Sequence, residues 1–154
     1  MMRFAPEGRP FIGAALVLAA VAWAAAVGVG GWLHAVAGAC TVLALFVAFF
    51  FRDPRREGPD DPGAVLAPAD GRVVEIEEVD EPVFLRGRCR RISIFLSVFD
   101  VHVQRSPVSG TVEHRSYRPG GYAVAWKPKA SEENEQASVG LGCQGGGRVL
   151  VRQI

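Results

Sequence analysis

The residues best suited to chemistry stand where an apolar stretch turns polar, just after position 96. Ile92, Ile94 and Leu96 fall on one side of this stretch and Ser93 and Ser97 on the other, and this period of two predicts a strand with one buried face. A carboxylate, an imidazole, an amide and a guanidinium then follow within six residues, from Asp100, His102, Gln104 and Arg105. A strand that ends on such a set predicts a functional site rather than a plain connection.

A second carboxylate, Asp70, stands in the sequence Pro-Ala-Asp-Gly at 68–71. An aspartate followed by a glycine is typical of a turn, and a lone histidine in a β domain is more often structural than catalytic. Together, however, Asp70 and His102 supply two members of a nucleophile-activating triad, in which the carboxylate orients the imidazole and the imidazole removes a proton. We therefore take Asp70 and His102 as the candidate catalytic pair, which still needs its nucleophile.

Other chemical signals are weaker. We interpret His34 and His114 as structural, and the glycines at 140–145 as a glycine-rich hairpin, because no helix follows them to receive a pyrophosphate. The three cysteines lie far apart without a CxxC pair, which predicts reduced thiols and no metal site. Lys127 and Lys129 stand in a polar run that forms either a solvated loop or a contact with lipid phosphate.

Two apolar runs, at 11–27 and 32–51, precede these candidates and contain no charged residue. Each is near the ~20 residues that cross a bilayer as a helix, and Gly-Val-Gly-Gly at 28–31 separates them. We predict a transmembrane helical hairpin. Arginines flank its two ends and none stands in the turn, so both ends are expected to be cytoplasmic. A signal peptide for the first run, or a hairpin that does not fully cross, is the alternative.

The remainder predicts a linker and a mainly β domain. Residues 52–63 hold three prolines and two glycines among charges, as linkers do. After this linker, 64–154 is expected to form a partial β-rich catalytic domain, a compact barrel or sandwich of short strands that is incomplete at its C-terminus. Strands are expected at 65–68, 72–79, 82–86, 89–96, 108–116 and 148–154, with 82–86 and 89–96 pairing across Gly87. A helical turn is expected only near 131–136.

Four motifs in order resemble the short, archaeal-type phosphatidylserine decarboxylases, from the second apolar run to Ile154. They are Phe-Phe-Arg-Asp-Pro at 50–54, Pro-Ala-Asp-Gly at 68–71, the stretch 95–110 with Asp-Val-His, and Lys-Ala-Ser-Glu-Glu-Asn-Glu at 129–135. The resemblance implies a proenzyme that cleaves itself at a glycine–serine bond. The serine becomes a pyruvoyl group, which forms a Schiff base with phosphatidylserine and releases CO2 and phosphatidylethanolamine.

The same resemblance implies that Asp70 is the acidic member of the self-cleavage triad. It implies that His102 is an orienter and proton carrier in cleavage, decarboxylation or both. Larger bacterial members carry a second histidine three residues on, where this chain has Arg105. Ser131 and Ser138 are not preceded by glycine. We therefore expect the pyruvoyl serine beyond Ile154 and a chain truncated before its cleavage site, which is inactive alone.

The expected partners are phosphatidylserine in the membrane and the protein's own C-terminal α subunit after cleavage, while a homo-oligomer is left open. A net charge of +1 indicates no nucleic acid, and the β domain is expected on the cytoplasmic side of the cell membrane. The alternative function is a membrane-anchored lipoyl- or biotinyl-like β module without catalysis, since 67–73 resembles the opening of such domains. A zinc peptidase would need a second histidine and a carboxylate at ligand spacing.

Overall fold

A computed structural model describes residues 3–59, 61, 63–123 and 133–154. The chain divides into two compact units. Unit 1 comprises Met1–Glu57 and Ser97–Val103, and unit 2 comprises Gly58–Leu96 and Gln104–Ile154. The first unit therefore contains the N-terminal helices together with the short loop that carries His102.

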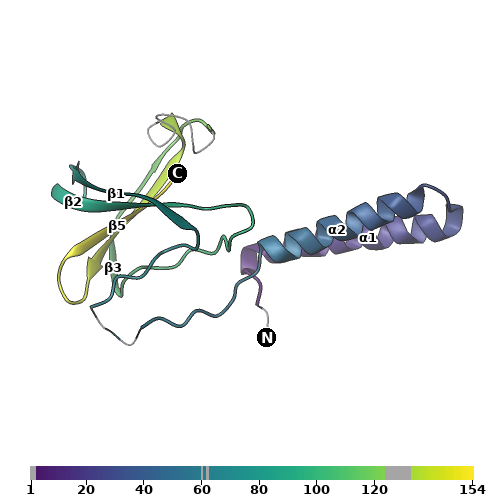
Figure 1. Ribbon diagram of the computed structural model, residues 1–154, viewed down its shortest axis with the longest axis horizontal. Helices are drawn as coiled ribbons and strands as arrows, with labels where there is room; N and C mark the ends of the chain where they lie inside the picture. The colour runs from purple at the N-terminus through teal and green to yellow at the C-terminus, as the bar shows by residue number, and fades with distance from the viewer. Residues whose placement is uncertain (1–2, 60, 62, 124–132) are drawn as a thin grey trace. The chain divides into compact units, whose positions relative to one another are not determined.

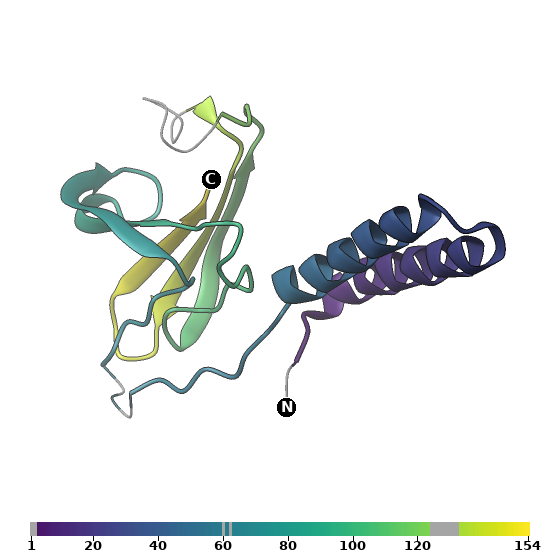
Figure 2. The ribbon, with the colours of Figure 1, turned by 45° about the vertical axis from the view of Figure 1, so that its right-hand side comes forward.

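Unit 1 is built on a hairpin of two antiparallel helices (Figures 1 and 2). A 3-10 turn at Pro6–Gly8 leads into α1 (Arg9–Val29), and α2 runs over Leu33–Phe50. The predicted helical hairpin is confirmed, with α1 two residues longer at each end than expected. Gly30 and Gly31 have φ angles of 80° and 62°, which glycine adopts without steric cost, and this explains why the first helix stops there.

The two helices pack through small side chains and expose their large ones. Alanines are buried along the contact, namely Ala15, Ala19, Ala26, Ala37 and Ala44. Trp23 adds one polar link, since its Nε1 donates to Oγ1 of Thr41 at 3.0 Å. Both helices are long and apolar enough to cross a membrane. Close approach through small residues, with bulky apolar groups outside, is the arrangement that membrane helices use.

The leader before α1 is fastened to the chain that leaves α2. Phe4 and Arg52 form an isolated antiparallel bridge, and the Ala5 amide donates to the Phe51 carbonyl at 2.9 Å. A side chain at Gly8 would meet the Phe51 ring, whose nearest atom lies 2.3 Å from the position of a Cβ. The open end of the hairpin is thereby closed by backbone pairing.

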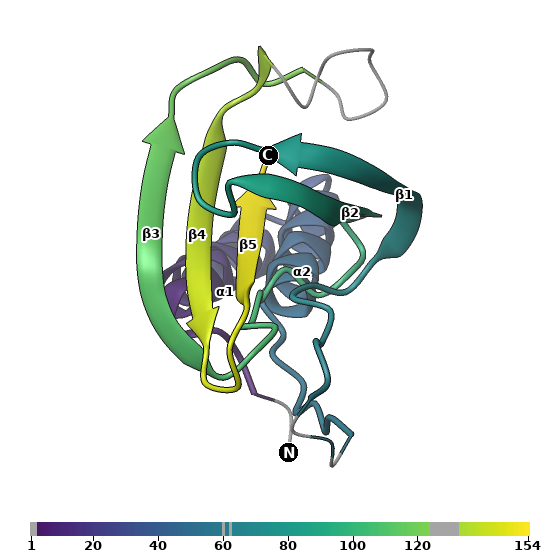
Figure 3. The ribbon, with the colours of Figure 1, turned by 90° about the vertical axis from the view of Figure 1, so that its left-hand side faces the viewer.

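Unit 2 contains two antiparallel sheets (Figure 3). β1 (Arg72–Glu81) pairs with β2 (Gly87–Phe95), and β4 (Gln136–Cys143) lies between β3 (Gly110–Arg118) and β5 (Arg148–Gln153). The helices and β-rich part that the sequence predicts are confirmed at this level, whereas a closed barrel or sandwich stays a prediction. The glycine-rich hairpin is also confirmed, because β4 and β5 pair across it.

Two strand expectations were wrong. Residues 82–86 form the turn between β1 and β2 rather than a strand, because the Glu81 carboxylate accepts the amides of Val83, Phe84 and Leu85 at 3.3, 2.7 and 2.8 Å. Those bonds curl the chain at the point where an extended run was expected. The strand expected at 65–68 is absent, since these residues form an irregular segment that ends in a bend.

A small cluster centred on Phe84 joins the two sheets of unit 2. Its ring stacks on His114 with centroids 5.6 Å apart, and a Cβ at Gly140 would lie 2.7 Å from it. The guanidinium of Arg148 lies 5.3 Å from the same ring, and Arg152 approaches Glu81 at 3.8 Å. The Phe84 side chain itself is buried. The polar run with Lys127, Lys129 and Ser131 lies outside the described residues.

Candidate active site

The loop Ser97–Val103 begins with a tight turn that Asp100 closes. Oδ2 of Asp100 accepts the Ser97 amide at 2.8 Å, and the Asp100 amide donates to the Ser97 carbonyl at 2.9 Å. This reciprocal pair is a side-chain-capped turn. Asp100 therefore shapes the loop, and Val101 behind it is buried.

His102 is half-buried, and its ring lies against Phe50, the last residue of α2. The two ring centroids are 4.1 Å apart with planes inclined by 30°. Nδ1 lies 3.0 Å from the Asp100 carbonyl oxygen. Because a carbonyl oxygen can only accept, Nδ1 carries the proton in this bond, which leaves Nε2 of the neutral ring as the basic nitrogen. The imidazole is thus oriented and has one nitrogen suited to accept a proton.

Arg52 fastens the same loop to the end of α2. Its Nη2 donates to the Phe99 carbonyl at 2.7 Å and its Nη1 to the Phe49 carbonyl at 2.8 Å. The guanidinium also lies 3.7 Å from the centroid of the Phe49 ring, and Phe46 meets Phe99 edge to face at 6.4 Å. A planar fork with several donors can join two carbonyls in this way.

Sequence reasoning did not predict that Arg52 positions the loop. It counted Arg52 only among the arginines that orient the hairpin in the membrane. Its partner Phe99 stands 47 residues further along the chain, so no local pattern could reveal the contact. The only hint lay in the Phe-Phe-Arg-Asp-Pro run at 50–54, which is one of the four family-like motifs.

Asp70 lies in unit 2, half-buried, in the bend before β1. The following Gly71 has a φ of 122°, and a Cβ there would lie 2.4 Å from the Phe95 carbonyl oxygen. Both facts require glycine at this position. The bend is held by Arg105, whose amide donates to the Pro68 carbonyl at 2.8 Å. The turn chemistry predicted for Asp70 is therefore present.

The four polar residues at 100–105 are divided between the two units. Asp100 and His102 belong to unit 1, whereas Gln104 and Arg105 belong to unit 2. There Oε1 of Gln104 accepts Nε2 of Gln153 at 2.6 Å. The pairing of Asp70 with His102 stays a prediction, since these two residues also belong to different units.

The other two histidines have local partners. His34 approaches the Gly31 carbonyl at 3.3 Å and lies edge-on to Trp23, while His114 stacks on Phe84 and lies 3.3 Å from Oγ of Ser116. These contacts agree with the structural interpretation of both. Within the part of the chain that the structure describes, no group of three or more His, Cys, Asp or Glu side chains could hold a metal ion.

Comparison with known proteins identifies the group to which this arrangement belongs. Residues 43–154 match the profile of phosphatidylserine decarboxylase. The chain belongs to the phosphatidylserine decarboxylase family. A phosphatidylserine decarboxylase proenzyme of Symbiobacterium thermophilum is 50% identical over 151 residues, covering 97% of this chain and 66% of that protein. The proenzyme of Salinibacter ruber is 57% identical over 111 residues, covering 71% of this chain and 49% of that protein.

A third proenzyme of this family, from Nitrosomonas europaea, is 44% identical over 150 residues, or 97% of this chain and 66% of that protein. The family predicted from the four motifs is thus confirmed. It is a different family from the lipoyl- or biotinyl-like module considered above. The chain spans between about half and two thirds of the length of these relatives.

Proposed function

We propose that the whole protein is a phosphatidylserine decarboxylase that forms phosphatidylethanolamine and CO2 at the surface of a membrane. The observation that carries this proposal is the docking of the His102 loop on the end of α2. His102 stacks on Phe50, and Arg52 holds the neighbouring backbone. A phospholipid keeps its tails in the bilayer, so chemistry on its headgroup requires a proton-transfer group at the bilayer surface.

Membrane insertion is supported by the surface of the hairpin. Large apolar side chains along both helices are exposed, with Val17 at 64% and Leu45 at 66% exposed. Covering such side chains with lipid removes apolar surface from water, at about 25 cal/mol per Å². Arginines flank both ends of the hairpin and none stands in its turn, which supports a cytoplasmic position for the ends and for the loop with His102.

The family's proenzymes imply a pyruvoyl group, and the donor set around His102 fits one. Nδ1 is held by the Asp100 carbonyl, so Nε2 is available to hold a proton or to deliver one to a pyruvoyl group or its substrate. When bound, a pyruvoyl group supplies a carbonyl that takes up the substrate amine and withdraws electrons from the bond to the departing carboxylate. We assign His102 the transfer of a proton at Nε2, and Asp70 the carboxylate role in self-cleavage.

The proposal is tested by lipid analysis of cells that express the whole gene. His102→Asn keeps an amide nitrogen near the position of Nδ1 but removes the basic Nε2. We expect this change to lower phosphatidylethanolamine formation from phosphatidylserine by about 10²-fold or more. His114→Asn is the matched control, because that ring contacts Phe84 and Ser116, and it should leave the activity largely intact. Equal activity of the two variants would refute the assignment of His102.

A further inference from the structure

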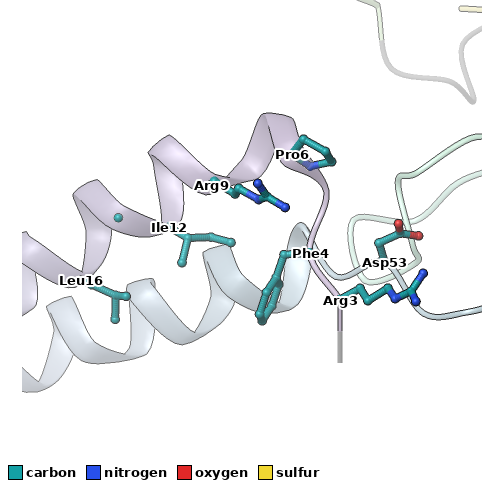
Figure 4. Close-up of a pocket in the computed structure, with 8 residues that line it drawn as sticks. Arg3, Phe4, Pro6, Arg9, Ile12, Leu16 and Asp53 are labelled. Carbon is teal, nitrogen blue, oxygen red and sulfur yellow. The ribbon is translucent and has the colours of Figure 1, made fainter. Parts of the chain in front are cut away.

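A groove lies at the open end of the helical hairpin, within unit 1 and at the start of α1 (Figure 4). Its volume of about 660 Å³ falls within the roughly 300–1,000 Å³ of small-molecule sites. The lining comes from the leader, from the first two turns of α1 and from the third residue after α2, and comprises Arg3, Phe4, Pro6, Arg9, Ile12, Gly13, Leu16 and Asp53.

The polar and apolar parts of the lining are separated along the groove. Figure 4 shows Arg9 on the first turn of α1 and the side chain of Arg3 extending towards Asp53, with Ile12 and Leu16 following along the helix. The eight residues from Arg9 to Leu16 extend about 10 Å along the axis. A ligand that fills the groove therefore needs a charged end and an apolar stem.

The walls of this groove are fixed by backbone contacts. The Asp53 amide donates to the Arg3 carbonyl at 2.7 Å, and the Ala5 amide donates to Phe51. Phe11 stacks on Phe51 with ring centroids 5.5 Å apart and planes 9° from parallel. Because the leader is paired with the chain after α2, Arg3 and Phe4 are held beside the helix instead of leaving it as a free tail.

The charges of the groove identify the ligand. Two guanidinium groups and one carboxylate give a formal charge of +1 at the end that meets the bilayer surface. Arginine binds phosphate oxygens with its planar fork, and a basic pocket at the cytoplasmic end of membrane helices attracts anionic headgroups. Ile12 and Leu16 match the first methylenes of an acyl chain.

We propose that this groove binds a glycerophospholipid whose headgroup carries a net negative charge. The phosphate lies against Arg3 and Arg9, and an acyl chain follows Ile12 and Leu16. Among the described residues, the groove lining contains none from the His102 loop, so this is a second lipid site beside the proposed substrate site. The bound lipid stabilises the paired leader at the membrane surface. The inference rests on the membrane placement proposed above and is independent of decarboxylation.

The test measures lipid selectivity of the full chain in phosphatidylcholine nanodiscs. Spin-labelled phosphatidylglycerol or spin-labelled phosphatidylcholine is added, and electron paramagnetic resonance gives the ratio of their association constants. In the double variant Arg3→Gln/Arg9→Gln, we expect the preference for phosphatidylglycerol to fall by about tenfold. The matched control is Arg55→Gln/Arg56→Gln, which removes the same charge from residues outside the lining and should change the preference less than about twofold.

An equal loss of preference for phosphatidylglycerol in the two double variants would show only a general attraction of the lipid to arginine and would contradict the proposed site. Glycerophosphoglycerol, which has the headgroup without tails, should not displace the spin-labelled lipid, and displacement would mean a free phosphate site instead. Wild-type protein supplies a test that depends on no variant. Phosphatidylglycerol with a photoreactive acyl chain should label the peptide containing Ile12 and Leu16, and even labelling around both helices would contradict the proposal.

Discussion

Replacing Arg52 by lysine should loosen the His102 loop without removing a charge. The guanidinium joins two carbonyls, those of Phe49 and Phe99, and covers the Phe49 ring. A lysine ammonium is a compact point charge that does not reproduce this planar fork. The change therefore isolates the geometry of Arg52 from its contribution to membrane topology.

The size of the effect follows from the contacts that are lost. The hydrogen bond from Arg52 to the Phe99 carbonyl, which joins the loop to α2, contributes about 1 kcal/mol. The exposed cation–π contact with Phe49, which holds the guanidinium in place, adds about 0.5–1 kcal/mol. Lysine keeps part of both, so we expect a loss of about 1–2 kcal/mol in docking of the loop. That corresponds to a change of about 5–30-fold between docked and undocked forms.

Hydrogen–deuterium exchange of the full chain in nanodiscs measures this equilibrium directly. The amides of the loop, including the Asp100 amide, should exchange about 5–30-fold faster in Arg52→Lys, while those of β3, β4 and β5 should be unchanged. Arg55→Lys is the control, because the Arg55 side chain is exposed and lies 3.9 Å from the Glu57 carboxylate. Unchanged loop exchange in Arg52→Lys would refute the positioning role of Arg52.

Three further predictions concern unit 2. Glu81→Gln should destabilise this unit by about 2 kcal/mol in chemical denaturation, because an amide oxygen replaces a carboxylate that accepts three backbone amides. Burial opposes ionisation of Glu81, but the backbone amides of Leu85, Phe84 and Val83 and the charge of Arg152 outweigh it, so the pKa of Glu81 is lowered. The stabilisation should therefore be present above pH 4.5 and be lost as the pH falls through the lowered pKa. The Glu81→Gln variant should lack this acid dependence. The Glu135 carboxylate accepts hydrogen bonds from the hydroxyls of Tyr117 and Tyr122 and raises the pKa of both above 10.0, so Glu135→Gln should shift the ultraviolet titration downwards, and an unshifted curve would disprove the contact. Asp70→Asn in the whole gene product should leave a single uncleaved band on a gel, whereas normal cleavage into two subunits would remove Asp70 from the self-cleavage triad.

The hairpin and the turns could be predicted because their causes are local. Long uncharged runs and the glycines that follow α1 act within a few residues, and the structure has helices at Arg9–Val29 and Leu33–Phe50. The Asp70–Gly71 bend is also local, since glycine is required by its φ of 122°. The pairing of β1 with β2 was misjudged because one side chain, Glu81, bends the chain through three hydrogen bonds that no apolar pattern encodes.

The surroundings of His102 were beyond sequence reasoning for a different reason. The sequence identified the histidine, but the ring on which it packs, Phe50, stands 52 residues earlier, where the sequence was interpreted as the end of a membrane helix and the start of a family-like motif. Its polar partner is the backbone carbonyl of Asp100, and because every residue has a backbone carbonyl, the amino-acid sequence does not reveal this contact. Contacts of this kind depend on how the loop packs, and they emerge only with the fold.

The central claim is the proposal that the whole protein decarboxylates phosphatidylserine with His102 as a proton-transfer group at the bilayer surface. The most direct measurement is the release of labelled CO2 from phosphatidylserine labelled in the serine carboxyl group, by membranes containing the whole gene product. We expect release by the wild-type protein and by His114→Asn, and a rate lower by about 10²-fold or more in His102→Asn. Release by His102→Asn at the wild-type rate, or none by the wild-type protein, would contradict the account.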